Sequence, residues 1–379
     1  MRRLVITMCL TIGLAGCGGN AEPPPTAPAP AAATATLPVT TSPTVAAATA
    51  TAPVSPLPSA TLPISPLPSA TVPISPLPEP SALSARALWR LGGATDAADA
   101  GGPQFTELGG LAVGDGLLYV ADAYGGVFTF DMAGGYQGVI SAGEIMYITD
   151  VAVGPAGKVY IADAGLHQVT RFSADHDLLG GFGAYGSGDG EFGSDGPAAL
   201  AVGPGGEVFA LDPNVDAAGA ALMRVQVFGP EGDFRRAFPA EPGPDAADLA
   251  VGPDGTLFIV SRQGYVAEVE PEAGRLIQQI GSTALGSSAE GAAAFPQGIA
   301  LDEAGNLFLT TQAPAAVAVL GATGHRLEAR IGVETVRTEE GWPAGELLMP
   351  RGIAVTADGA RVFVAESAAG FAYVTAFAR

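Results

Sequence analysis

The stretch Leu249–Arg262, LAVGPDGTLFIVSR, decides the fold of this chain because it occurs in six related copies. Each copy has a short apolar run, a turn that contains glycine, and a second apolar run with an aromatic residue in register. The spacing between successive copies is 40 to 54 residues. Self-similarity at such a period is the signature of a repeat architecture. The aligned copies begin at Leu111, Val151, Leu200, Leu249, Ile299 and Ile353.

The two apolar runs of each copy predict a β-hairpin. They span four to six residues, which is too short for helices, and the Asp-Gly or Gly-Gly turns between them are typical of hairpins. The runs are apolar at nearly every position, so both faces of the sheet should be buried. Two further runs follow in most copies, for example Gln168–Phe172 and Leu178–Phe182. The sequence therefore predicts four antiparallel strands per repeat.

Six such repeats predict a β-propeller, in which four-stranded blades stack radially and cover each other's faces. The sixth copy ends at Arg379, after its third strand. The missing strand is expected before the first copy, in Ala87–Gly92, whose pattern ALWRLG resembles the other fourth strands. We therefore predict an all-β, six-bladed β-propeller of four-stranded antiparallel blades over residues 86–379. Its N-terminal strand closes the last blade, so that neither end leaves an unpaired edge.

The N-terminus is typical of an export signal. Arg2 and Arg3 precede an apolar run over residues 4–14, which has the length of a signal core and is too short to span a membrane. The motif LAGC ending at Cys17 resembles the bacterial lipobox. That resemblance implies cleavage before Cys17, lipidation of its thiol, and a lipid-anchored, extracytoplasmic place in the bacterial cell envelope. The alternative is an ordinary secretory signal with a chance cysteine.

Residues 18–85 consist largely of Ala, Pro, Thr and Ser. Prolines at this density interrupt both helices and sheet ladders. We predict a disordered, polyproline-type linker between the signal peptide of residues 1–17 and the propeller. The alternative is a proline-rich docking motif.

Parts of the repeat resemble the NHL repeat. Phe295–Gly298 provides a Phe followed by Pro-x-Gly before the first apolar run, and Gly305-Asn306 then precedes the second. The glycine-rich segment Gly186–Phe192 resembles the lead into such a repeat. Copies one, two and four lack Pro-x-Gly. The resemblance implies a propeller in which the loops between blades and the turns between second and third strands build one face.

The loops of that face are the expected place of function, since binding residues concentrate on loops held by a rigid scaffold. The long segments are Gly93–Gly110, Gly183–Ala199, Gly281–Gly298, Gly332–Gly352 and the turn Asp212–Leu222. Residues just before each inner strand should ring the central opening. Two of these loop residues have alternative roles to binding: Arg351 forms a salt bridge within its loop, or Trp342 packs under its own loop. The candidate ligand- or partner-binding residues are Thr149, Asp150, Asp248, Gln297, Trp342 and Arg351.

The charge of the chain excludes one class of partner. The formal net charge is −21, and Lys158 is the only lysine. Nucleic-acid binding requires a basic surface, so we expect no nucleic-acid partner. An acidic face suits cationic partners, or serves solubility alone. We expect a monomer whose partner is a protein or a cell-envelope component.

The sequence provides little of the chemistry of propeller enzymes. The blade pattern keeps its histidines apart, so they cannot form a zinc site or supply a base for a serine nucleophile. Asp189, Glu191 and Asp195 offer oxygen ligands for Ca²⁺, but the same Gly-Asp-Gly sequence is explained by a turn. We therefore expect no catalytic residue, no metal ligand and no cofactor, with Ca²⁺ as the alternative. The histidines are His167, His176 and His325.

The favoured hypothesis is a binding or scaffold module that acts through the inter-blade loop face. The alternative is a propeller hydrolase or lyase acting on a small metabolite in the central channel. A third hypothesis, carbohydrate binding, predicts exposed aromatic residues on the loop face.

Overall fold

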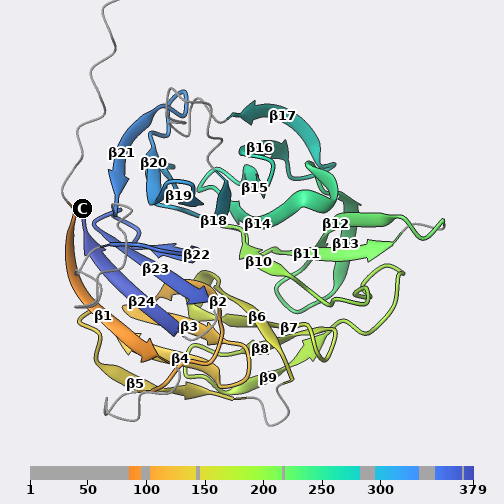
Figure 1. Cartoon of the computed structure of the whole chain (residues 1–379). Helices are drawn as coiled ribbons and strands as arrows, with labels where there is room; N and C mark the ends of the chain where they lie inside the picture. The colour runs from red at the N-terminus through yellow and green to blue at the C-terminus, as the bar shows by residue number, and fades with distance from the viewer. Residues whose placement is uncertain are drawn as a thin grey trace, which may run out of the picture. The chain divides into compact units, whose positions relative to one another are not determined.

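The computed structural model describes residues 85–94, 103–141, 146–215, 218–281, 295–332, 346–368 and 371–379. Their strands form six four-stranded antiparallel sheets. The sheets surround a central axis as the blades of a propeller (Figure 1). The predicted six-bladed, all-β fold is therefore confirmed. The predicted signal peptide, Cys17 and the linker up to residue 84 lie outside the described residues.

Each of the first five blades follows the chain order from the axis outward, with one inner strand nearest the axis (Figure 1). Blade 1 has β2 (Leu108–Gly114), β3 (Leu117–Asp122), β4 (Gly126–Asp131) and β5 (Tyr136–Ile140). Blade 2 has β6 (Ile148–Val153), β7 (Val159–Asp163), β8 (Gln168–Phe172) and β9 (Leu178–Phe182). Blade 3 has β10 (Ala199–Val202), β11 (Val208–Val215), β12 (Ala221–Phe228) and β13 (Phe234–Pro239). Blade 4 has β14 (Ala246–Val251), β15 (Leu257–Ser261), β16 (Tyr265–Glu270) and β17 (Arg275–Ile280). Blade 5 has β18 (Pro296–Leu301), β19 (Leu307–Gln312), β20 (Ala315–Leu320) and β21 (Leu327–Ile331).

Within the described residues, helical structure is confined to two short 3-10 turns, η1 (Pro155–Gly157) and η2 (Gly243–Asp245). None of the helices described there has the length and apolar character to cross a membrane.

Blade 6 is assembled from both ends of the propeller sequence. It contains β22 (Pro350–Val355), β23 (Arg361–Ala368) and β24 (Phe371–Ala378), and its outer strand is β1 (Arg86–Ala94). β1 runs antiparallel to β24, with Leu91 opposite Val374. The indole Nε1 of Trp89 also donates to the carbonyl of Met132 in blade 1, at 3.2 Å. The prediction that the N-terminal strand closes the last blade is confirmed, and β24 has no free edge.

The blades pack through a repeated small-against-large contact near the axis. Each inner strand carries an alanine at one register position, and each alanine shares a hydrophobic cluster with two branched aliphatic residues of the next inner strand. Ala250, for example, clusters with Ile299 and Leu301. Blades come closest together at the axis, and close packing there leaves room for only one large side chain of each facing pair. The six alanines are Ala112, Ala152, Ala201, Ala250, Ala300 and Ala354.

The aromatic residue of each second strand is buried one layer farther out. These side chains are between 0% and 5% exposed. They supply the large apolar area that holds neighbouring blades together. The aromatic residues are Tyr119, Tyr160, Phe209, Phe258, Phe308 and Phe363.

The predicted long turn Asp212–Leu222 is wrong. β11 and β12 continue as a hairpin in which Asn214 lies opposite Leu222 and Val215 lies opposite Ala221. The strands carry polar residues here, because the buried Asp212 carboxylate accepts from Arg224 Nε at 2.7 Å on the partner strand. This polar pair interrupts the continuous apolar run that would have indicated strands.

We predict that Ala250→Leu lowers the free energy of unfolding by about 1–3 kcal/mol, because the added carbons must enter the packed contact with Ile299 and Leu301. Denaturant unfolding of the full chain measures the change. Ala133→Leu, in an exposed hairpin turn, is the matched control. An equal effect of the two substitutions would contradict the proposed tight spacing at the axis.

Candidate ligand pocket on the channel axis

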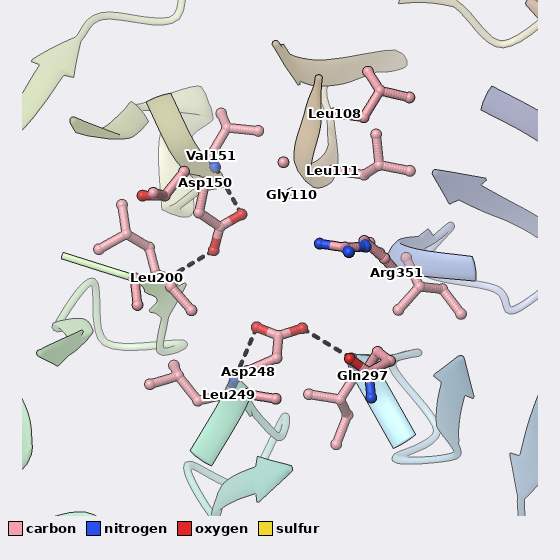
Figure 2. Close-up of a pocket in the computed structure, with 18 of the residues that line it drawn as sticks. Leu108, Gly110, Leu111, Asp150, Val151, Leu200, Asp248, Leu249, Gln297 and Arg351 are labelled. Carbon is pink, nitrogen blue, oxygen red and sulfur yellow. Dashed lines mark hydrogen bonds between the residues drawn. The ribbon is translucent and has the colours of Figure 1, made fainter. Parts of the chain in front are cut away.

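The six inner strands begin around a cavity of about 200 Å³ on the propeller axis. It lies on the loop face, where the inter-blade connections enter the inner strands. Figure 2 shows side chains from several blades pointing into it. Five predicted binding residues line this cavity, and Trp342 lies outside the described residues. These five are Thr149, Asp150, Asp248, Gln297 and Arg351.

Asp150 and Asp248 each join two neighbouring inner strands. The Asp150 carboxylate accepts from the backbone N–H of Val151 at 2.8 Å and from that of Leu200, in the next blade, at 2.7 Å. Asp248 accepts in the same way from Leu249 at 2.8 Å and from Ile299 at 2.9 Å. Both carboxylates therefore have a structural role: blade 2 is tied to blade 3, and blade 4 to blade 5.

The same register position holds a small residue in the other four blades. These residues are Gly110, Ala199, Gly298 and Gly352. In blade 1 this small size is required, since a Cβ on Gly110 would lie 1.5 Å from Asp150 Oδ1. The carboxylates thus occupy alternate blades of the ring, and Gly110 leaves space for Asp150.

The environment of the pocket raises the pKa of both carboxyl groups. Burial raises the pKa of Asp248 to about 6, against the two backbone hydrogen bonds that lower it. Burial and the nearby charge of Asp248 raise the pKa of Asp150 well above its usual range. Desolvation penalises the charged form, and two like charges facing one cavity add to that penalty for Asp150. The pair titrates as a coupled unit at higher pH than exposed carboxylates.

Arg351 presents a free guanidinium to the pocket. Its side chain is exposed and points toward the cavity (Figure 2). Within the described part of the chain it makes no ion pair or hydrogen bond through its side chain. The alternative role predicted for Arg351, a loop salt bridge, therefore has no partner there.

Thr149 and Gln297 have local contacts. The Thr149 hydroxyl donates to the carbonyl of Pro197 at 2.6 Å, which links blade 2 to the loop before blade 3. The Gln297 amide Nε2 donates to the carbonyl of Pro296 at 3.1 Å. Thr149 therefore has a structural partner, whereas the Gln297 side chain bonds only to its preceding residue.

Sequence reasoning missed one charged lining residue, Arg262, which follows β15. Its guanidinium donates to the carbonyl of Ala246 at 3.4 Å. A signal existed, since most copies carry a small or uncharged residue at this position, such as Ala123 or Ala164. The pocket therefore combines two carboxylates with two guanidinium groups.

Most other buried carboxylates of the face hold loop backbone. Asp122 ends β3 and accepts from the backbone N–H of Gly125 at 2.8 Å. Asp163 ends β7 and accepts from Tyr147 N–H at 3.1 Å. Glu366 is equivalent in blade 6 and accepts from Leu348 N–H at 2.6 Å. These carboxylates accept hydrogen bonds from backbone N–H groups of the surrounding loops and turns. The axial pocket is therefore the more distinctive site.

The candidate metal ligands among the described residues do not form a metal site. In the part of the chain that the structure describes, no three His, Cys, Asp or Glu side chains gather to hold a metal ion. His176 contacts the Tyr119 hydroxyl at 3.2 Å, and His325 contacts the Glu268 carboxylate at 3.2 Å, in different blades. The Glu191 carboxylate accepts from Gly188 N–H at 2.9 Å, as expected of a turn.

Aromatic residues are exposed on the same face, over blades 1 to 3. Tyr124 is 65% exposed and Tyr185 is 70% exposed. The Tyr124 and Tyr147 rings meet edge to face at 5.5 Å, and the Tyr147 hydroxyl donates to Glu107 at 3.2 Å. These tyrosines lie outside the strands of the repeat, so the repeat pattern did not indicate them.

Solved propellers of low sequence identity resemble this structure. A streptogramin B lyase structure matches with a TM-score of 0.50 and 14% identity, over 77% of this chain and 98% of that chain. A gluconolactonase from Xanthomonas campestris matches with a TM-score of 0.52 and 17% identity, over 78% of this chain and 98% of that chain. No protein-family model and no curated protein matches the sequence. Such likeness establishes the fold alone.

We predict that the free energy of unfolding decreases as pH rises from about 4 to 7, by at least about 2 kcal/mol, through Asp150 and Asp248. Their pKa values are raised by folding. The folded state therefore binds more protons than the unfolded state over this range, and its advantage is lost as the pH passes the folded pKa.

Denaturant unfolding at several pH values measures this dependence. The double variant Asp150→Asn/Asp248→Asn should flatten the slope, whereas Asp175→Asn, in an exposed turn, should keep it. Glu366, whose pKa is also raised by burial, is present in both proteins and does not affect the comparison. An unchanged slope in the double variant would contradict the assignment.

Proposed function

We propose that this propeller is a binding module and that its loop face, centred on the axial pocket, is the recognition surface. The observation that carries the proposal is the guanidinium of Arg351, which has no ion pair or hydrogen bond with the described residues and faces a cavity that also contains the carboxylates of Asp150 and Asp248. Convergent polar groups in a preformed concavity are the usual mark of a ligand site.

The two mouths of the channel support this choice of face. The opposite mouth is a wider cavity of about 600 Å³, whose wall includes one branched aliphatic residue from each inner strand. Its described lining residues also include the carboxyl residues Asp115, Asp302 and Glu303 but no arginine or lysine, whereas Arg262 and Arg351 line the pocket on the loop face. The six aliphatic residues are Val113, Val153, Val202, Val251, Leu301 and Val355.

The exposed Tyr124 and Tyr185, with the half-buried Tyr147, support a larger contact area on the loop face. Tyr124, Tyr147 and Tyr185 combine an apolar ring with a polar hydroxyl, a combination favoured at binding surfaces. With a net charge of −21, the surface suits a protein or cell-envelope component and disfavours nucleic acid. We further propose that the chain is a monomer, anchored through a lipid on Cys17 in the extracytoplasmic part of the bacterial cell envelope.

The alternative function is a hydrolase or lyase acting on a small metabolite in the channel. The raised pKa values of Asp150 and Asp248 favour it, and two of the solved propellers that this chain resembles are a streptogramin B lyase and a gluconolactonase. We favour binding because the hydrogen bonds that Asp150 and Asp248 accept from four backbone N–H groups give both carboxylates a structural role. The other described residues that line the pocket include no His, Glu, Lys, Cys or Tyr to act as a partner acid or base.

We predict that a small compound from a bacterial envelope extract binds the full chain in equilibrium dialysis, and that Arg351→Gln weakens its binding at least tenfold. Arg275→Gln, whose side chain is 77% exposed on outer strand β17, is the matched control and should bind like the unmodified protein. Mass spectrometry identifies the compound in both compartments of the dialysis cell. Recovery in a chemically altered form would favour the enzyme alternative. The absence of any Arg351-dependent compound would contradict the binding proposal.

A further inference from the structure

Six backbone N–H groups occupy one equivalent position around the axis. Each belongs to an inner-strand residue that lies opposite the corresponding residue of the second strand, as Val151 lies opposite Ile161. Leu111 opposite Val120 and Ile353 opposite Val364 keep this register. The six residues are Leu111, Val151, Leu200, Leu249, Ile299 and Ile353.

Four of these N–H groups are bound by side chains of the pocket. Val151 and Leu200 donate to Asp150, and Leu249 and Ile299 donate to Asp248. An N–H that donates to a carboxylate in the channel points away from the second strand, as in the non-hydrogen-bonded pairs of an antiparallel ladder. The four bonds therefore fix the direction of this register position toward the channel.

The remaining two N–H groups, of Leu111 and Ile353, have no such acceptor. Their register directs them to the same channel edge. Among the described residues, no side chain accepts a hydrogen bond from either of them. Backbone N–H groups at such an edge require a partner, either water or a ligand.

Leu111 and Ile353 belong to blades 1 and 6, where the alternation of the carboxylates predicts a third one. Asp150 serves blades 2 and 3, and Asp248 serves blades 4 and 5, so a third carboxylate would serve blades 6 and 1. The equivalent residue is Gly352, where a Cβ would lie 2.7 Å from the carbonyl oxygen of Gly109. A side chain at this position would collide with the backbone of blade 1. The chain therefore has no carboxylate at position 352. The neighbouring residue Arg351 points its guanidinium into the same cavity.

We propose that the pocket binds a small zwitterionic amino acid whose carboxylate accepts from Leu111 N–H, Ile353 N–H and Arg351. The ammonium group of the ligand faces Asp150 and Asp248. This inference rests on the proposed function, that the axial pocket is the recognition site.

The charges and the size of the pocket agree with this ligand class. A guanidinium with two backbone donors suits a carboxylate, while a pair of carboxylates suits an ammonium. A cavity of about 200 Å³ is smaller than the roughly 300–1,000 Å³ of ordinary small-molecule sites. The ligand therefore has the size of a small amino acid, and its two charged groups reach opposite sides of the pocket.

Calorimetric titration of the full chain tests the proposal with defined probes. Glycine, β-alanine and γ-aminobutyrate carry both charges at increasing separation, whereas acetate and ethylammonium carry one each. At least one zwitterion should bind at least tenfold more tightly than both single-charge probes. Arg351→Gln should weaken its binding at least tenfold, and Arg275→Gln should leave it unchanged. Asp248→Asn provides a second variant on the ammonium side of the pocket.

Three results would overturn the proposal: no zwitterion binds, acetate binds as tightly as the best zwitterion, or Arg351→Gln has no effect. The exposed position of Arg351 makes this variant independent of folding defects that the loss of Asp248 can cause. The dialysis experiment separates the two proposals. An Arg351-dependent ligand without an ammonium or a carboxylate would overturn the zwitterion inference and leave the binding function standing. No Arg351-dependent ligand and no zwitterion binding would reject both.

Discussion

Six strand edges meet at the axis of this propeller, and none of them has a neighbouring strand with which to pair. The inner edge of each blade must therefore satisfy its backbone N–H groups by other means. The axis is also the place where the blades come closest, so side-chain volume is restricted there. The ring of alanines fits the restricted volume at the axis. The carboxylates of Asp150 and Asp248 accept from the backbone N–H groups of four of the six inner strands.

The candidate pocket lies where these carboxylates satisfy only four of the six inner-edge N–H groups. Two carboxylates in alternate blades leave one sector with glycine at the equivalent position, and Arg351 stands beside it. Asp150 and Asp248 hold blades together and also give the pocket its negative side, so their substitution affects stability and recognition at once. Arg351 has no structural partner among the described residues, and its substitution tests recognition alone.

The sequence was sufficient to predict the fold because each repeat carries the same small set of physical signals. The buried aromatic residue of each second strand, such as Phe308, and the glycine turn before it recur in register. The closing role of β1 followed from the sixth copy, which ends one strand short. The extension of the β11–β12 hairpin beyond Asp212 was missed, since the Asp212–Arg224 pair placed polar residues where a continuous apolar run was expected.

The site was partly predictable for the same reason. Residues before each inner strand had to surround the axis, which placed Thr149, Gln297 and Arg351 correctly at one cavity. The bonds between blades were not predictable, because the repeat pattern does not show that Asp150 reaches Leu200, 50 residues away. Arg262 and the exposed tyrosines lie outside the repeated signals, and only the folded ring brings them to the loop face.

Native-state amide hydrogen exchange of the full chain, resolved by NMR at the six inner-edge residues, tests the central claim most directly. The account predicts that the amides of Val151, Leu200, Leu249 and Ile299 are protected by their carboxylate acceptors. The amides of Leu111 and Ile353, relative to their intrinsic rates, should exchange at least about tenfold faster. Equal protection of all six amides would mean that the third sector already has an acceptor within the protein, and would contradict the account.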